Sequence, residues 1–129
     1  MRKLILLLIL LLTVSGVWIV FGTQGPESGW AKALYLTHIW GGLFFVVVFP
    51  MYVWDHVSAN RAWLRVAAWV TVSGAGQLTS GVLLIVSGIV LLLYGAQAWQ
   101  GLRDLHHWLT YLLVGLLAVH FLSPKRPGG

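Results

Sequence analysis

The sequence predicts an all-α integral membrane protein, a four-helix bundle of up-down topology with both termini in the cytoplasm. Hydrophobic residues make up 59% of the 129 residues and charged residues only 9%, and the mean hydropathy is +0.87. A soluble domain of this size needs a much larger charged share to cover its surface. We therefore expect a single transmembrane domain that comprises residues 1–129.

Four apolar segments are each long enough to cross a bilayer as a helix. The first follows Arg2 and Lys3, and its apolar run is longer than the core of a typical signal peptide. Pro50 lies inside the second segment and is expected to kink that helix or to tighten its last turns. The predicted spans are residues 4–21, 33–56, 72–94 and 105–122.

Basic residues and tryptophans indicate the orientation of these spans. Six basic residues fall on one predicted side and two on the other, so the positive-inside rule places both termini in the cytoplasm. Because topology accounts for these charges, no nucleic-acid partner is expected. The cytoplasmic set is Arg2, Lys3, Arg61, Arg65, Lys125 and Arg126, and the outer set is Lys32 and Arg103. Tryptophans gather at both predicted boundaries, at positions 30, 40, 99 and 108 outside and 54, 63 and 69 inside.

The connection between the second and third spans, residues 58–69, interleaves apolar residues with Arg61 and Arg65. This pattern favours a segment that lies in the membrane interface, or a third helix that extends backward through it. Two interpretations of the arginines stay open. They are candidates to bind carboxylate groups at the inner face, or they serve only as topology charges.

Five histidines lie in the second and fourth spans, and the sequence contains no cysteine. His38 and His56 are 18 residues apart, which is five whole turns at about 100° per residue, so they share a helix face. His106 and His120 are 14 residues apart, roughly 40° from alignment, and share a face as well. Imidazoles inside lipid are costly unless they have a partner or a metal. The spacing predicts haem iron held between His38 and His106 near the outer face, and between His56 and His120 near the inner face.

Several alternatives stay open at these histidines. His107 is an alternative to His106, although it points about 140° away from His120 around the helix. The rise from His38 to His56 is roughly 27 Å, against roughly 21 Å from His106 to His120. Helix tilt, a changed rise near Pro50, or a single occupied haem level would each account for this difference. A histidine at a helix end can also snorkel to the interface and bind nothing.

Glycines recur every seven residues in the third span, and the first three of them follow a serine. A seven-residue repeat drifts only about 20° per step, so these glycines form a stripe on one helix face. Such a stripe lets helices approach closely, or lets a flat macrocycle lie against bare backbone. The stripe consists of Gly74, Gly81, Gly88 and Gly95, and Gly16 holds the corresponding place in the first span. Val14-Ser15-Gly16 and Val86-Ser87-Gly88 further suggest a duplicated helical hairpin.

The end of the chain resembles a known group of proteins. Leu105-His106-His107-Trp108 and Ala118-Val119-His120-Phe121, after a serine–glycine helix, are similar to the four-helix membrane cytochromes b. That family includes the cytochrome b subunits of formate dehydrogenase and nickel–iron hydrogenase. The resemblance extends over all four spans in plan and is specific over the final part of the chain.

This resemblance implies two b haems, a location in the bacterial plasma membrane, and electron transfer between quinone and a partner redox subunit. The implied ligands are His38, His56, His106 and His120. The chain departs from the family in the second span, where Tyr52 stands 14 residues after His38 and the histidine comes one turn later. We find no residues that indicate a quinone site, and we expect an electron-transfer subunit rather than a stand-alone enzyme.

Two other functions compete with electron transfer. A small transporter usually carries a carboxylate inside the membrane, whereas Glu27, Asp55 and Asp104 are predicted in loops or at span ends. A cofactor-free accessory subunit would pack against larger partners through its glycine face, and the purified protein would be colourless.

Overall fold

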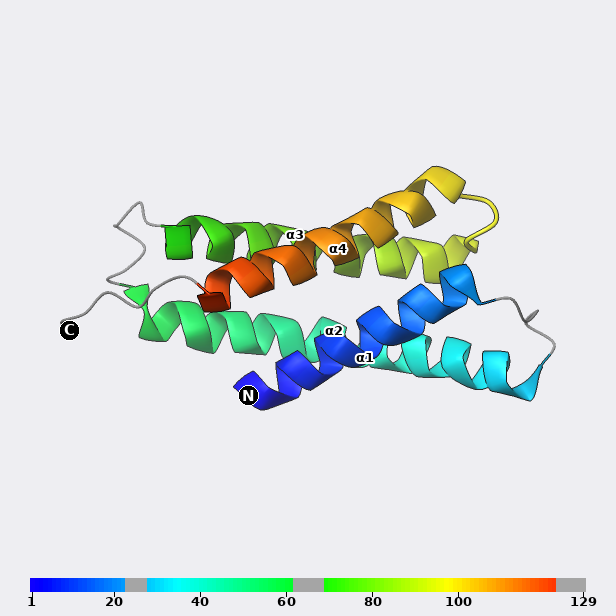
Figure 1. Ribbon diagram of the computed structural model, residues 1–129, viewed down its shortest axis with the longest axis horizontal. Helices are drawn as coiled ribbons and strands as arrows, with labels where there is room; N and C mark the ends of the chain where they lie inside the picture. Colours follow the sequence, from blue (N-terminus) through cyan, green and yellow to red (C-terminus); the bar gives the residue numbers. More distant parts are fainter. Residues whose placement is uncertain (23–27, 62–68, 123–129) are drawn as a thin grey trace. The chain divides into compact units, whose positions relative to one another are not determined.

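Four long helices make up the chain in our computed structural model, which describes residues 1–22, 28–61 and 69–122 (Figure 1). Each helix is long and apolar enough to cross a membrane. Helices suit lipid because all their backbone hydrogen bonds lie within the segment. The predicted all-α class with four long apolar helices is confirmed, and each helix begins two to five residues before its predicted start. The helices are α1 (Arg2–Phe21), α2 (Gly29–Ala59), α3 (Trp69–Tyr94) and α4 (Gln100–Leu122).

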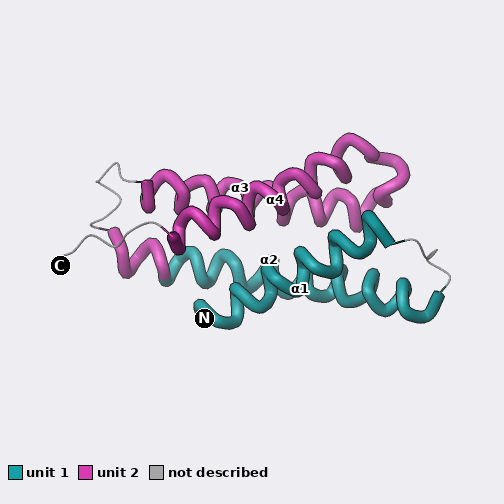
Figure 2. Tube along the Cα trace, viewed as in Figure 1, with its two compact units in different colours: residues 1–55 teal, residues 56–129 magenta. Residues whose placement is uncertain are grey.

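The chain divides into two compact units, residues 1–55 and 56–129 (Figure 2). The first unit holds α1 and most of α2. The second holds the last turn of α2 together with α3 and α4. Within the first unit α1 and α2 run in opposite directions, and within the second α3 and α4 do the same (Figure 1). This alternation agrees with the predicted up-down order.

The helix ends follow local backbone chemistry. The Ser28 hydroxyl accepts a hydrogen bond from the Ala31 amide at 3.2 Å, which satisfies a free donor in the first turn of α2. Gly95 adopts a positive φ of 83° and donates its amide to the Leu91 carbonyl at 2.9 Å. This left-handed conformation suits glycine and ends α3. Gly95 therefore caps the helix and does not continue the glycine stripe, because the helix ends at Tyr94.

The long helix α2 continues through Pro50 to Ala59. Past its end, the Asn60 side chain donates a hydrogen bond to the His56 carbonyl at 2.7 Å, and Arg61 is exposed. Residues 62–68 of the predicted interfacial connection lie outside the described residues, and so does Arg65.

Glycines bring the helices of each hairpin close together. In the first hairpin a Cβ placed on Gly41 would lie 3.2 Å from a methyl group of Leu12. In the second, a Cβ on Gly76 would lie 2.8 Å from Leu116 Cδ1, and the Gln77 side chain donates to the Leu116 carbonyl at 3.1 Å. Small residues allow close approach of transmembrane helices, and an interhelical hydrogen bond adds to the attraction.

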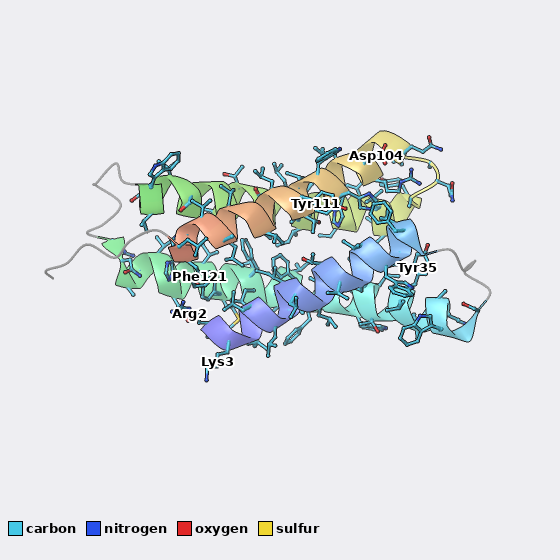
Figure 3. All side chains as sticks on the ribbon, viewed as in Figure 1. Arg2, Lys3, Tyr35, Asp104, Tyr111 and Phe121 are labelled. Carbon is cyan, nitrogen blue, oxygen red and sulfur yellow. The ribbon has the colours of Figure 1, made fainter. Side chains whose placement is uncertain are left out.

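The outer surface of the helices is apolar. Most large hydrophobic side chains are exposed, including Trp40, Trp54 and Trp108, each about 70% exposed. So much exposed apolar surface fits contact with lipid. Charged side chains lie toward helix ends: Arg2 and Lys3 are at the start of α1, and Asp104 is near the start of α4 (Figure 3). These features support a multi-pass membrane protein.

Candidate functional site

The first hairpin joins His38 of α2 to a serine–glycine pair of α1. The Ser15 hydroxyl oxygen lies 2.9 Å from His38 Nδ1. The neighbouring glycine, Gly16, leaves the space that the ring fills, because a Cβ there would lie 3.1 Å from His38 Cε1. Ser15 is 2% exposed and the imidazole is half-buried. The ring is thus held by a hydrogen bond on one nitrogen and by bare backbone beside its Cε1.

The second hairpin repeats this arrangement between α3 and α4. Ser87 Oγ lies 2.7 Å from His106 Nδ1, and a Cβ on Gly88 would lie 3.4 Å from His106 Cε1. Ser87 is buried, while His106 is half-buried. His107 is half-buried as well, but the serine contact is made to His106.

A third copy lies in the same hairpin, near the start of α3 and the end of α4. Ser73 Oγ lies 3.1 Å from His120 Nδ1, and a Cβ on Gly74 would lie 4.0 Å from His120 Cε1. Ser73 precedes Ser87 by 14 residues, and His120 follows His106 by the same number. Because the helices are antiparallel, equal steps in opposite directions bring the second pair to a common level about 21 Å from the first.

Each serine hydroxyl lies within hydrogen-bond distance of both a ring nitrogen and a carbonyl of its own helix. Ser15 Oγ lies 2.8 Å from the Leu11 carbonyl, and Ser87 Oγ lies 2.7 Å from the Leu83 carbonyl. A hydroxyl has one proton, and these carbonyls can only accept it. When the hydroxyl donates to the carbonyl, its oxygen is free to accept a hydrogen bond from Nδ1–H of the ring. In that neutral tautomer the lone pair lies on Nε2, the nitrogen suited to bind a metal.

His56 lies in the last turn of α2 and is exposed. Its ring centre is 6.3 Å from that of His120, and the two ring planes are inclined by 66°. Both residues belong to the second unit. The two histidines that the sequence pairs at the inner face are therefore neighbours. Tyr52, which occupies the position one turn earlier, is half-buried.

The other predicted site residues are placed as follows. Gly81 is buried in α3 between the two serine–glycine pairs. Arg61 is exposed just past α2. Arg103 pairs with Asp104 at 3.4 Å on the exposed start of α4.

No group of three His, Cys, Asp or Glu side chains that could hold a metal ion forms within residues 1–22, 28–61 and 69–122. A haem needs only two axial side chains, because the porphyrin supplies the remaining ligands.

The serine–histidine contacts are the feature that the histidine spacing does not predict. A signal for them exists in the sequence, because the triplet valine–serine–glycine occurs three times and each copy meets a histidine of the next helix. The triplets begin at Val14, Val72 and Val86. The intervening pair in α3, Ser80-Gly81, follows a threonine instead.

Comparisons with known proteins give no match to this chain among family models, curated proteins or solved structures. Function is therefore inferred from the residues described above.

Proposed function

We propose that this chain is a b-type haem cytochrome of the membrane, which relays electrons across the bilayer between a quinone pool and a partner redox subunit. One recurring observation carries the proposal. Three histidines on lipid-spanning helices each hydrogen-bond a buried serine through Nδ1 and lie beside a glycine. Polar groups of this kind inside a membrane are expensive and mark functional sites.

The donor set fits a b haem. Its iron takes two axial imidazoles, and a ligating histidine almost always donates its other ring N–H to a fixed acceptor. The proposed ligands are His38 with His106 at the outer level and His56 with His120 at the inner level, paired by their depth along each helix. His106 is favoured over His107 because Ser87 contacts His106.

The inner pair adds a separate support. Two imidazoles that share one iron have ring centres about 6 Å apart, because each metal–nitrogen bond is about 2 Å long and each ring centre lies about 1 Å beyond its nitrogen. The ring centres of His56 and His120 are separated by 6.3 Å. This spacing favours His56 over Tyr52 as the ligand that α2 contributes.

When bound, haem iron supplies one-electron transfer by cycling between its ferric and ferrous states. The residues of the chain orient the imidazoles, because buried serines contact Nδ1 of three of the rings. Serine contacts and burial also influence the reduction potential. Arg61 and Arg65 are the proposed partners of the inner propionates. Two b haems, iron, a quinone or quinol, and a redox subunit complete the proposed assembly in the lipid.

The competing functions have less support. A transporter usually carries a carboxylate within the membrane, and the described carboxylates, Asp55 and Asp104, lie near the ends of α2 and α4. A cofactor-free accessory subunit would present its glycine face to a partner. Gly16 and Gly88 instead face histidine rings of their own hairpins.

A spectrum tests the proposal directly. The full chain, purified from membranes in detergent, is expected to show the reduced-minus-oxidised bands of low-spin b haem, and an added quinol should reduce it. His120→Ala should lose the inner haem's share of these bands, because the variant lacks one axial ligand. Unchanged bands in His120→Ala would refute the ligand assignment, and a colourless wild-type chain would refute the function.

A further inference from the structure

We infer that Ser15, Ser73 and Ser87 are positioning residues that hold His38, His120 and His106 as Nδ1–H tautomers and increase the basicity of their Nε2 atoms. The consequence for iron binding rests on the proposed function. The assignment of the tautomers depends only on the hydrogen bonds within each hairpin.

The burial of the serines makes this control effective. All three are at most 3% exposed, so water does not compete for their hydroxyl groups. Each hydroxyl lies within hydrogen-bond distance of a carbonyl one turn back on its own helix: Leu11 for Ser15, Val70 for Ser73 and Leu83 for Ser87. With its proton used there, the oxygen offers a lone pair to the imidazole. Free histidine in water favours the opposite tautomer, with hydrogen on Nε2. The serine contacts therefore shift the equilibrium between the two neutral tautomers toward the form with hydrogen on Nδ1.

The same contact alters the electronic character of the ligand. An acceptor on Nδ1–H increases electron density in the ring and raises ligand basicity. A more basic imidazole stabilises ferric over ferrous iron and so lowers the reduction potential. Removing the hydroxyl should therefore weaken haem binding and raise the potential of the affected haem. A purely structural serine would change neither the tautomer nor the potential.

Ser80 provides a matched control. It lies on the same helix as Ser73 and Ser87, seven residues from each, and its exposure of 2% is equal to theirs within a percentage point. Ser80→Ala removes the same atom from the same helix without touching a serine–histidine pair. Ser87→Thr supplies the opposite control, because it keeps a hydroxyl at the critical position.

The experiment combines nitrogen NMR with haem titration of the full chain. Histidine labelled with ¹⁵N is observed in lipid nanodiscs at alkaline pH in the haem-free full chain, because iron bound to Nε2 would by itself place the proton on Nδ1. We expect protonated Nδ1 for His38, His106 and His120. Ser87→Ala should release His106 from this form, while Ser80→Ala leaves all three rings unchanged. Added haemin should bind the Ser87→Ala site about 10- to 100-fold more weakly, with a more positive midpoint potential, and Ser87→Thr should restore both.

The outcomes separate this inference from the proposed function. Protonated Nε2 at the three histidines of the wild-type chain would overturn the inference, as would equal behaviour of Ser87→Ala and Ser80→Ala. If haem binds normally in either case, the proposed function stands. If the wild-type chain binds no haemin and its Nδ1 protons still respond to the serine variants, the tautomer assignment holds and the cytochrome proposal fails.

Discussion

The His38 ring packs against the bare backbone of Gly16, where a Cβ would lie only 3.1 Å from Cε1. Ser15, the preceding residue, binds Nδ1 of the same ring. Two adjacent positions of α1 therefore control one imidazole, the first by a hydrogen bond and the second by leaving space. The corresponding separations are 3.4 Å for Gly88 with His106 and 4.0 Å for Gly74 with His120.

Alanine at these glycines should disturb the histidines in the order of those separations. Gly16→Ala forces the His38 ring to move while Ser15 holds it, so we expect a loss of about 1–3 kcal/mol in the free energy of unfolding. Gly88→Ala should cost less, and Gly74→Ala least, with haem content falling in the same order. Denaturant titration and haem per polypeptide measure the two effects. Gly115→Ala, whose Cβ meets open space, is the control. Equal losses at the three sites would contradict the steric argument.

Adjacent histidines of α4 offer a test of ligand identity. His106→Ala should remove the outer haem's absorbance, because an axial ligand is lost. His107→Ala should retain that absorbance, because the Ser87 contact selects His106. Absorption spectra of the two purified variants, normalised to protein, give the answer. Loss of the outer haem in His107→Ala with retention in His106→Ala would reverse the assignment.

The inner ligand on α2 is tested by the same method. His56→Ala should lose the inner haem, since the His56 and His120 ring centres lie 6.3 Å apart. Tyr52→Phe keeps the aromatic ring and should keep both haems. Spectra and iron content of the two variants are compared with those of the wild-type chain. Full haem content in His56→Ala would show that the second ligand comes from elsewhere.

The contact between Gly76 and Leu116 predicts a compensating pair of substitutions. Gly76→Ala places a Cβ 2.8 Å from Leu116 Cδ1 and should destabilise the chain by about 1–3 kcal/mol. Leu116→Ala in the same chain removes the obstructing methyl group and should recover part of that loss. Unfolding free energies of the two single variants and the double variant measure the coupling. Strictly additive free energies would rule out the contact as the cause.

The orientation can be tested by labelling, because the chain contains no cysteine. Ala98 lies between α3 and α4, Ala59 ends α2, and both residues are exposed. With both termini in the cytoplasm, a membrane-impermeant maleimide added outside intact cells should label Ala98→Cys and leave Ala59→Cys unlabelled. Labelling of both variants after lysis is the control. The opposite pattern would reverse the predicted topology.

The sequence predicted the helices well because span hydropathy sums over many residues. Errors were confined to the helix ends, where single residues determine at which position a helix begins or stops. Gly95 followed the seven-residue pattern of the glycine stripe, yet its positive φ makes it the cap of α3. The extension of α2 back to Gly29 likewise depends on one local contact, the Ser28 hydroxyl with the Ala31 amide.

The candidate site was predictable only along each helix. Spacing put His106 and His120 on one face, but it could not give the rotation of α4 relative to α3 that brings Ser87 to His106. The equal 14-residue steps from Ser73 to Ser87 and from His106 to His120 indicate how α3 and α4 are aligned along their lengths. They become informative once the hairpin is known to be antiparallel. The pairing of His38 with His106 about one iron stays a prediction.

A pyridine haemochrome assay on the purified full chain, with iron quantified per polypeptide, tests the central claim most directly. We expect protohaem, the b type, at two haems and two irons per chain. A chain free of haem and iron, isolated from cells that supply haem to their other cytochromes, would contradict the claim.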